Sequence, residues 1–249
     1  MRSLIAAELL KLRTTRMLAV CVGVVVLLAA ALPIFAGAVA GHRGEPALAP
    51  SSLADFLRAP AQLSGAAVLL VGLLAAAGEF RHRTIFSTRL EEPRTTRLLA
   101  AKLITLAAVG VVVGLAMGLV ATAVGALVLE RHHVAVEPLA HGVPRLAVVL
   151  PAVIALQGML GVAIGALLRN TAAAVGATLV WAFVVEGVVP VLTGQPHVTN
   201  WLPSGAIHEV IAGHTQAGQL PPVTAAAVLI AYAGVLITAT VILDRSREI

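Results

Sequence analysis

Two polar side chains lie deep within apolar stretches of this sequence, and they are the first candidates for chemistry. Gln157 falls within residues 146–168 and Glu186 within residues 171–192. An ionisable group in hydrocarbon costs about 2.5–3.5 kcal/mol on insertion scales, so its retention usually marks a water-filled path, a partner or a functional site. We expect Glu186 either to line a translocation path or to make a hydrogen bond between helices. Gln157 is assigned to the same path, with a structural hydrogen bond as the favoured alternative.

A charged segment, residues 78–102, is the second candidate site, because it separates two fully apolar stretches. It contains Glu79, Phe80 and a concentration of positive charge. Six of the 17 basic residues of the chain lie here: Arg81, Arg83, Arg89, Arg94, Arg97 and Lys102. A short helix with charges of both signs offers shape and charge complementarity to a soluble protein partner.

Enzymatic chemistry has no such candidates. We find no phosphate-binding loop of the form Gly-x-x-x-x-Gly-Lys-Ser/Thr, no Gly-x-Ser-x-Gly nucleophile motif and no His-Glu-x-x-His zinc motif. Seven of the eight histidines fall in segments predicted to lie outside the membrane, without the spacing typical of a zinc site. We interpret them as solvated loop residues, with metal binding as the alternative. We therefore expect a protein that is not an enzyme, with no catalytic residue, metal or cofactor of its own.

The composition indicates what must position the candidate residues. Hydrophobic residues make up 59% of the chain, charged residues 12%, and the mean hydropathy is +0.98. Such a chain would expose a very large apolar surface as a soluble domain. A helix needs about 20 apolar residues to cross a bilayer. Stretches of about this length are residues 17–40, 61–77, 103–129, 146–168, 171–192 and 223–243. We predict an all-α membrane protein with six transmembrane helices in a single domain, 1–249.

The orientation is predicted from lysine and arginine, which concentrate in cytoplasmic loops. If the amino terminus is inside, 13 of the 17 basic residues fall in inner segments. The outer segments keep only Arg43, Arg58, Arg131 and Arg145. We predict a multi-pass protein of the cytoplasmic membrane with both termini cytoplasmic. The net charge of +5 follows from this bias and does not indicate nucleic-acid binding.

The first 16 residues predict an amphipathic helix in the membrane interface. Ile5, Leu9 and Leu12 share one face at helical spacing, whereas Glu8 and Lys11 fall on the other. A simple basic flank that sets the topology is the alternative. A cleavable signal peptide is disfavoured, because the apolar run that follows is longer than the usual signal core.

Small residues and the last outer loop complete the pattern. Small residues about four apart favour close packing of helices in lipid. They include Gly110, Gly114 and Gly118, and also Gly158, Gly161 and Gly165.

The outer loop, residues 193–222, predicts a short helical turn that Ser204 would cap, with Ile207 and Ile211 on one face.

The chain resembles a known family in two segments. Residues 8–16, Glu-Leu-Leu-Lys-Leu-Arg-Thr-Thr-Arg, followed directly by a first span, resemble the start of the type-2 ABC transporter permeases, the membrane subunits of bacterial ABC exporters. Gly78-Glu79-Phe80-Arg81-His82-x-Thr84-Ile85, then Pro93-Arg94 and the run 98–103, is similar to the family's first cytoplasmic loop. Six spans, an interface helix and a partly helical last outer loop fit this family over the whole chain.

The resemblance implies a mechanism and partners. Two permease subunits, as a homodimer or a heterodimer, would each dock the loop into a separate ABC ATPase subunit, which binds ATP and magnesium and drives export. Glu79, Phe80, Arg81, Arg94 and Arg97 would lie at or near the docking helix.

The sequence departs from the family at Arg83, where glycine is frequent, and at Glu91-Glu92 before Pro93. These differences concern the fit to a particular ATPase.

Two other classes are alternatives. A structural or assembly membrane protein would use the basic loop only to set its topology. A secondary transporter would show repeated halves, and the sequence contains no convincing internal repeat. The scarcity of polar groups in the spans favours an amphipathic or lipophilic cargo for the exporter.

Overall fold

The architecture is entirely helical over the residues that the structure describes. This computed structural model describes residues 2–40, 48–49, 52–81, 95–136, 142–194, 196–213 and 219–246, and no strand occurs among them. Six helical segments are long and apolar enough to cross a membrane. The prediction of an all-α protein with six spans and an amino-terminal amphipathic helix is confirmed, and the chain is a multi-pass helical membrane protein.

The elements follow one another as spans joined by short connections. The chain begins with α1 (Arg2–Thr14), which leads into α2 (Arg16–Val39). Three long spans come next: α3 (Ser52–Arg81), α5 (Thr95–Arg131) and α6 (Val143–Leu168). The fifth span consists of α7 (Thr171–Val180), a π-helical segment η1 (Trp181–Val185) and α8 (Glu186–Thr193). A 3₁₀ turn η2 (Pro196–Trp201), α9 (Pro203–Ala212) and α10 (Pro222–Ser246) complete the chain.

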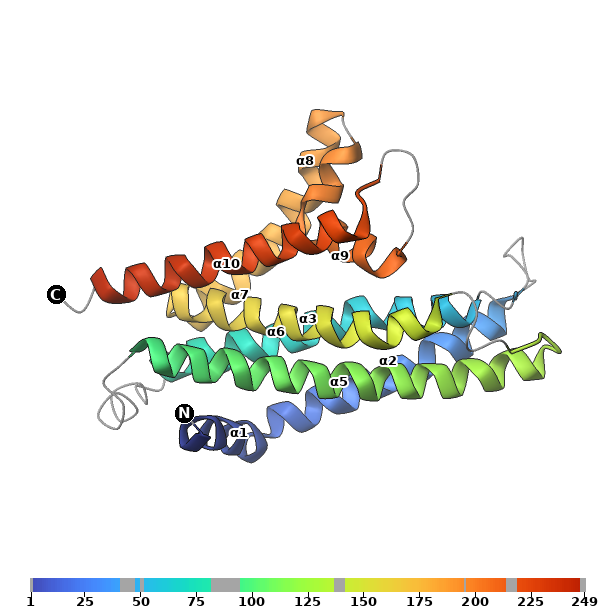
Figure 1. Ribbon diagram of the computed structural model, residues 1–249, viewed down its shortest axis with the longest axis horizontal. Helices are drawn as coiled ribbons and strands as arrows, with labels where there is room; N and C mark the ends of the chain where they lie inside the picture. The colour runs from blue at the N-terminus through green and yellow to red at the C-terminus, as the bar shows by residue number, and fades with distance from the viewer. Residues whose placement is uncertain are drawn as a thin grey trace.

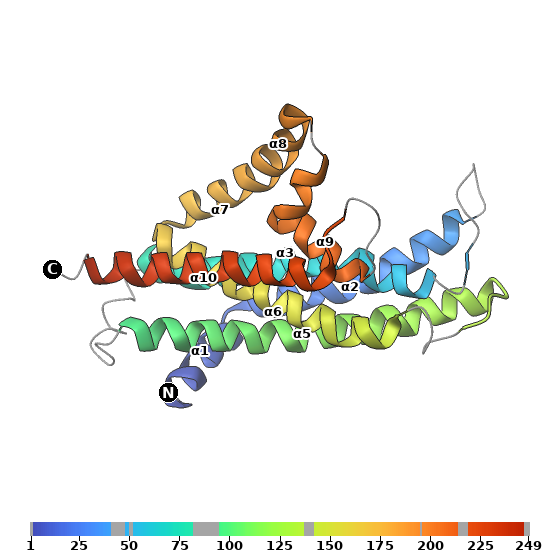
Figure 2. The ribbon, with the colours of Figure 1, turned by 45° about the horizontal axis from the view of Figure 1, so that its top comes forward.

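The long helices form one bundle from which the fifth span departs. α2, α3, α5, α6 and α10 run side by side, whereas α7, η1 and α8 tilt away from them (Figures 1 and 2). The two chain ends lie at the same end of the bundle (Figure 1). This placement is what an even number of spans requires.

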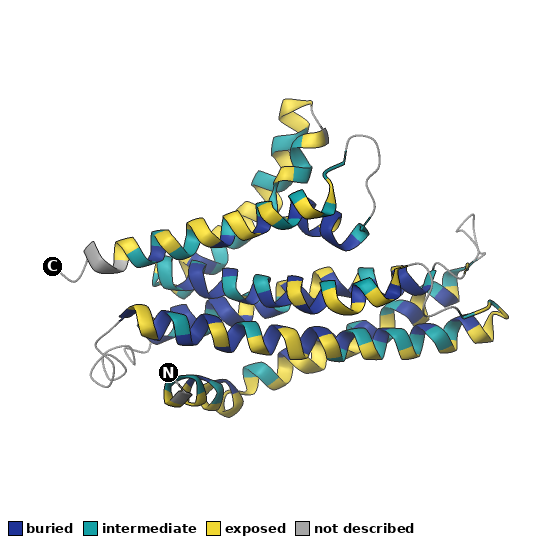
Figure 3. Cartoon of the chain, viewed as in Figure 1, coloured by how far each residue is buried: buried dark blue, intermediate teal, exposed yellow. Residues whose placement is uncertain are grey.

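The core of the bundle is the contact between α3 and α6, where the two backbones touch. A Cβ atom built at Gly161 would overlap the carbonyl oxygen of Leu69, and one built at Gly72 would overlap that of Gly158. Buried residues accordingly follow the inward faces of the central helices (Figure 3). Helices in lipid gain nothing from hydrophobic exclusion against each other, so this close approach supplies the van der Waals contact that holds them.

The contact between α5 and α6 uses the same device over part of its length. Gly110 and Gly114 lie against the backbones of Ala155 and Pro151, but a Cβ at Gly118 would have no atom within 4 Å. The two helices therefore touch along Gly110 and Gly114 and are separated at Gly118. The packing predicted for the small residues, within or between subunits, is confirmed within the chain for Gly110 and Gly114, and for Gly118 it stays a prediction.

Two helices, α3 and α5, extend beyond the predicted apolar stretches at both ends. α3 begins at Ser52, well before residue 61, and its first turns include an Asp55–Arg58 ion pair of 2.7 Å. α5 begins at Thr95, so the predicted loop 78–102 is helical at both of its ends, and residues 82–94 lie outside the described part of the chain. Hydropathy finds the lipid-facing portion of a helix, whereas paired polar residues extend the helix past it.

We expect Gly161→Ala to destabilise the protein more than Gly118→Ala. The methyl group at residue 161 would have to push the α3 backbone away, and overpacking of this kind costs about 1–3 kcal/mol. The methyl group at residue 118 would enter open space. Thermal unfolding of the two detergent-purified variants, followed by size-exclusion chromatography after heating, provides the measurement. Equal midpoints would mean that α3 and α6 separate at no cost.

Candidate functional site

Three consecutive residues at the end of α3 have three different surroundings. Glu79 is buried, with 8% of its surface exposed, whereas Arg81 is exposed. Phe80 lies between these extremes, and the Arg169 guanidinium stands over its ring at 5.2 Å from the centroid. Successive residues of a helix point about 100° apart, which explains the divergence. Of these three predicted docking residues, Arg81 has the exposed side chain.

The buried Glu79 belongs to a four-residue charge cluster that also contains Glu8, Lys11 and Lys102. The Lys102 Nζ lies 2.7 Å from a carboxylate oxygen of Glu8 and 2.7 Å from one of Glu79. The Lys11 Nζ lies 3.0 Å from Glu8 and 2.9 Å from Glu79. The cluster joins α1, α3 and α5, because each of these helices contributes at least one member.

Pairing outweighs burial in this charge cluster. Burial by itself would raise the pKa of Glu8, but the charges and hydrogen bonds of Lys102 and Lys11 hold that pKa below its ordinary value. Burial would lower the pKa of Lys11, but Glu79 and Glu8 hold it above the ordinary value. Glu8 therefore stabilises the fold above its unfolded pKa and loses that contribution as the pH falls through its lowered folded pKa. Lys11 stabilises the fold below its unfolded pKa and loses that contribution as the pH rises through its raised folded pKa, so Glu8 and Lys11 are both charged at neutral pH.

The remaining predicted docking residues are arginines at the start of α5. Arg97 is exposed in the first turn of this helix, and Arg94 lies outside the described residues. Glu8 and Lys11 were predicted as part of the polar face of the first helix, and Lys102 was predicted as one of the basic residues of segment 78–102, but no pairing among them was predicted. The signal that could have found them is a pair of opposite charges near the ends of apolar helices. Glu79 lies near the end of α3, and Lys102 lies near the start of α5.

Gln157 is buried where α3 and α6 cross. Its side chain lies against Gly65, since a Cβ at that position would overlap the amide oxygen Oε1. In the part of the chain that the structure describes, neither this oxygen nor the hydroxyl of the neighbouring Ser64 has a hydrogen-bond partner. The structural hydrogen bond expected of Gln157 is therefore not seen among the described residues.

Glu186 lies away from Gln157, on the span that tilts from the bundle. One carboxylate oxygen accepts a hydrogen bond from Trp181 Nε1 at 2.8 Å, and the other accepts from the backbone N–H of Ser204 at 3.2 Å. Ser204 is in the first turn of α9, so the carboxylate satisfies one of the free N–H groups of that helix. The prediction that the Ser204 side chain caps α9 is wrong: Leu202 holds the cap position, and no side chain at that position bonds the first turn.

The other end of α9 is held by two arginines. Arg145 of α6 donates to the carbonyl oxygens of Ile211, at 3.2 Å, and of Val210. Arg58 of α3 donates to that of Ala212 at 3.4 Å. Positive groups at a helix C-terminus and a negative group at its N-terminus both complement the helix dipole. α9 is thus fastened at both ends to three different spans.

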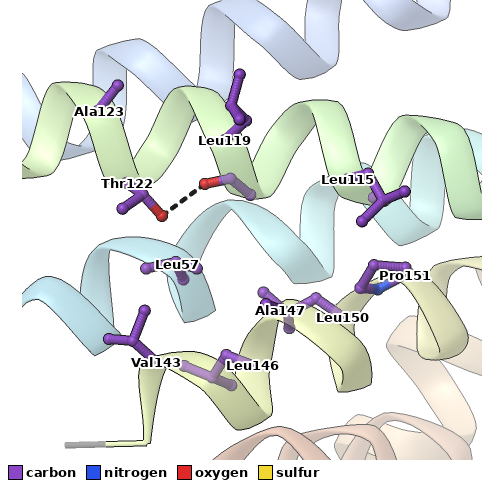
Figure 4. A pocket seen from close by; sticks show the side chains of 12 residues that line it. Leu57, Leu115, Leu119, Thr122, Ala123, Val143, Leu146, Ala147, Leu150 and Pro151 are labelled. Carbon is purple, nitrogen blue, oxygen red and sulfur yellow. Dashed lines mark hydrogen bonds between the residues drawn. The ribbon is translucent and has the colours of Figure 1, made fainter. Parts of the chain in front are cut away.

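The described cavity between α5 and α6 offers no polar chemistry. It has a volume of about 480 Å³ and forms where the two helices separate beyond Gly114, with Leu57 of α3 on its wall (Figure 4). The hydroxyl of Thr122 donates to the carbonyl oxygen of Gly118 at 2.7 Å, so its own helix satisfies it (Figure 4). No group of three potential metal ligands occurs among the described histidines, cysteine and acids.

We expect Lys102→Met to destabilise the protein far more than Lys11→Met. The first change removes the buried cation that Glu8 and Glu79 share and leaves them with the half-exposed Lys11, and breaking a buried pair in this way costs about 3–5 kcal/mol. Lys11 is 45% exposed, so water replaces much of its contribution. Denaturation midpoints of both purified variants at neutral pH test this order, and a larger loss for Lys11→Met would refute it.

No family model, curated protein or solved structure matches this chain. The likeness of its two segments to exporter permeases therefore enters below as part of a proposal.

Proposed function

We propose that this chain is the permease subunit of an ATP-driven exporter, which uses a separate ABC ATPase subunit as its energy source. The observation that carries the proposal is the four-residue charge cluster, which ties the interface helix α1 to both helices that flank residues 82–94. An ATPase that docked on this segment would move α1, α3 and α5 together, since one lysine holds glutamates of two of these helices. ATP and magnesium would bind to that partner.

The charge distribution on this side of the molecule supports a protein partner for the segment. Glu8 and Glu79 are turned inward to lysines, whereas Arg81 and Arg97 are exposed on the helices beside residues 82–94. The charged side chains that are exposed on the described parts of these helix ends are therefore arginines. Charge complementarity of this kind accelerates and orients the association of soluble partners.

The fifth span supports a second permease subunit as part of the assembly. Apart from Ala174, no residue of α7, η1 or α8 is buried. Its small residues Gly176 and Gly187 have open space at their Cβ positions. A second copy, or a related chain, would gain close packing there.

The proposal places α1, residues 82–94 and the carboxyl terminus in the cytoplasm and α9 outside. We expect His82→Cys and Ser3→Cys, made in a Cys21→Ala background, to be protected from an impermeant maleimide in intact cells. His208→Cys, on the exposed face of α9, should react readily. Reaction of all three from outside would reverse or abolish the proposed topology. Labelling of opened membranes controls for accessibility.

The ATPase partnership is tested by charge reversal at the start of α5. Arg94→Glu with Arg97→Glu should reduce recovery of a phosphate-loop ATPase that co-purifies with the wild-type chain, because each lost ionic contact costs on the order of 1 kcal/mol or more. The matched control is Arg245→Glu with Arg247→Glu, which makes the same change of charge near the carboxyl terminus. Co-purification and ATP turnover are measured for both pairs.

Equal recovery and equal ATP turnover for the two pairs of variants would leave these arginines with a topological role only. The absence of any such ATPase in complex with the wild-type chain would favour a structural membrane protein or a secondary transporter instead.

A further inference from the structure

The scarce large polar aromatic residues of this chain gather around Glu186. The sequence contains two tryptophans and one tyrosine, Trp181, Trp201 and Tyr232. Trp181 donates directly to the Glu186 carboxylate, and Trp201 ends η2 just before Ser204, the other donor. The Tyr232 hydroxyl of α10 donates to the carbonyl oxygen of Trp201 at 3.3 Å. Hydrogen bonds thus connect η1, η2, α9 and α10 in the region of Glu186, through the Trp181 ring, the Trp201 backbone and the Tyr232 hydroxyl.

The π-helical segment explains why Trp181 reaches Glu186. Residues five apart are hydrogen-bonded in a π-helix, and such segments are frequent at functional sites. Glu186 follows the segment directly, and its backbone N–H donates to the carbonyl oxygen of Trp181. The side chains of Trp181 and Glu186 are therefore on the same face. In a regular α-helix they would diverge.

The Trp181 ring is held by its N–H edge, and both tryptophans leave much of their surface open. Trp181 is 41% exposed and Trp201 is 53% exposed. Aromatic residues that merely anchor a protein at the membrane surface turn their polar edge toward lipid headgroups. Here the Trp181 N–H and the Tyr232 hydroxyl are both bonded to protein oxygens instead.

Among the described residues, the Glu186 carboxylate is bonded to neutral donors. Its partners among the described residues are an indole N–H and a backbone N–H. A carboxylate accepts about four hydrogen bonds, so two of its acceptor positions remain. Glu186 lies seven residues before Thr193, which corresponds to about 10 Å along the helix from its outer end. A carboxylate at this depth without a cation is costly unless something positive meets it.

We propose that Glu186, Trp181 and Trp201 form a binding site for hydrophobic organic cations, such as quaternary ammonium or phosphonium ions. The carboxylate supplies the charge, and the indole faces supply the cation–π attraction that makes tryptophan the best aromatic partner for such ions. The inference rests on the proposed function in one respect, since it names the cargo class of the exporter. The opposite end of α9, with Arg145 and Arg58, carries the wrong sign for this ligand.

Tetraphenylphosphonium and tetraphenylborate are matched probes, because they have the same shape and opposite charge. The chain has no tryptophan other than the two in the site, so quenching of intrinsic fluorescence reports occupancy directly. We expect saturable quenching by the cation, with the purified chain in zwitterionic lipid nanodiscs and empty nanodiscs as the blank. Saturable quenching of equal strength by the anion would overturn the proposal.

The decisive variant is Glu186→Gln, which keeps the size of the side chain and one acceptor oxygen. Its affinity for the cation should fall about tenfold or more, which corresponds to the loss of one desolvated charge contact. The control is Glu130→Gln, which neutralises an exposed glutamate at the outer end of α5 and should bind like the wild type. Unchanged affinity of a folded Glu186→Gln protein would refute the site.

A third variant, Trp201→Leu, is measured by equilibrium dialysis with radiolabelled cation and decides the matter if Glu186→Gln fails to fold. Its affinity should also fall several-fold, and wild-type affinity would exclude the ring from the site. No ATPase is present in these measurements. Failure of binding therefore removes this site, whereas failure of the co-purification described above removes the exporter assignment.

If the site carries cargo, Glu186→Gln should also reduce export of tetraphenylphosphonium from cells while leaving expression and assembly near normal. The measurement is the resistance to tetraphenylphosphonium of cells that express the variant, compared with cells that express the wild-type chain. Cation binding without any effect on export would limit the site to a regulatory role.

Discussion

A charge placed in a low-dielectric medium must have its partner built beside it, and this constraint arranges both ends of the molecule. At the end where the chain termini lie, two glutamates and two lysines neutralise one another between α1, α3 and α5. At the other end, one carboxylate and two guanidinium groups form hydrogen bonds with the backbone of α9. Between these two ends, backbone contact through glycine replaces polar bonding. The polar residues therefore fix which helices are neighbours at each end, and the apolar middle is free to pack closely.

The α9 helix illustrates how a short element is kept in place by a buried apolar face together with polar groups at both of its ends. Ten residues in isolation would not remain helical in water. Glu186 satisfies a donor in its first turn, and Arg145 and Arg58 satisfy acceptors in its last turn. Gly213 ends the helix in the left-handed conformation, with φ of 79°. Because it has no side chain, the Arg145 guanidinium can occupy the space beside it. The helix therefore depends on three spans, and a change in their spacing would reach it.

Much of this architecture could be predicted from the sequence, because hydropathy measures directly what a membrane requires. The six spans and the amphipathic first helix needed no knowledge of tertiary contacts. The charge cluster could not be predicted in the same way, because Glu8, Glu79 and Lys102 are far apart in the chain and only the packing of α1 on α5 brings them together. Trp181 and Glu186 are close in sequence, yet their pairing depends on a π-helical register that composition does not indicate. The expectation for Ser204 failed because residue identity suggested a cap, whereas Pro203 begins the helix and moves Ser204 into its first turn.

The length of α5 has a mechanical consequence. At a rise of about 1.5 Å per residue, its 37 residues form a rod of about 55 Å, which is longer than the hydrocarbon layer is thick. The rod touches α6 through Gly110 and Gly114, which lie near its middle. This contact divides the rod into arms of about 22 Å toward Thr95 and about 26 Å toward Arg131. The longer arm is packed against α2 and α3, because Val128 lies against Gly37 and Phe56 lies against Gly125. A load applied at Thr95 is therefore borne by neighbouring helices along the rod, and the cavity beside Gly118 is a gap in that support.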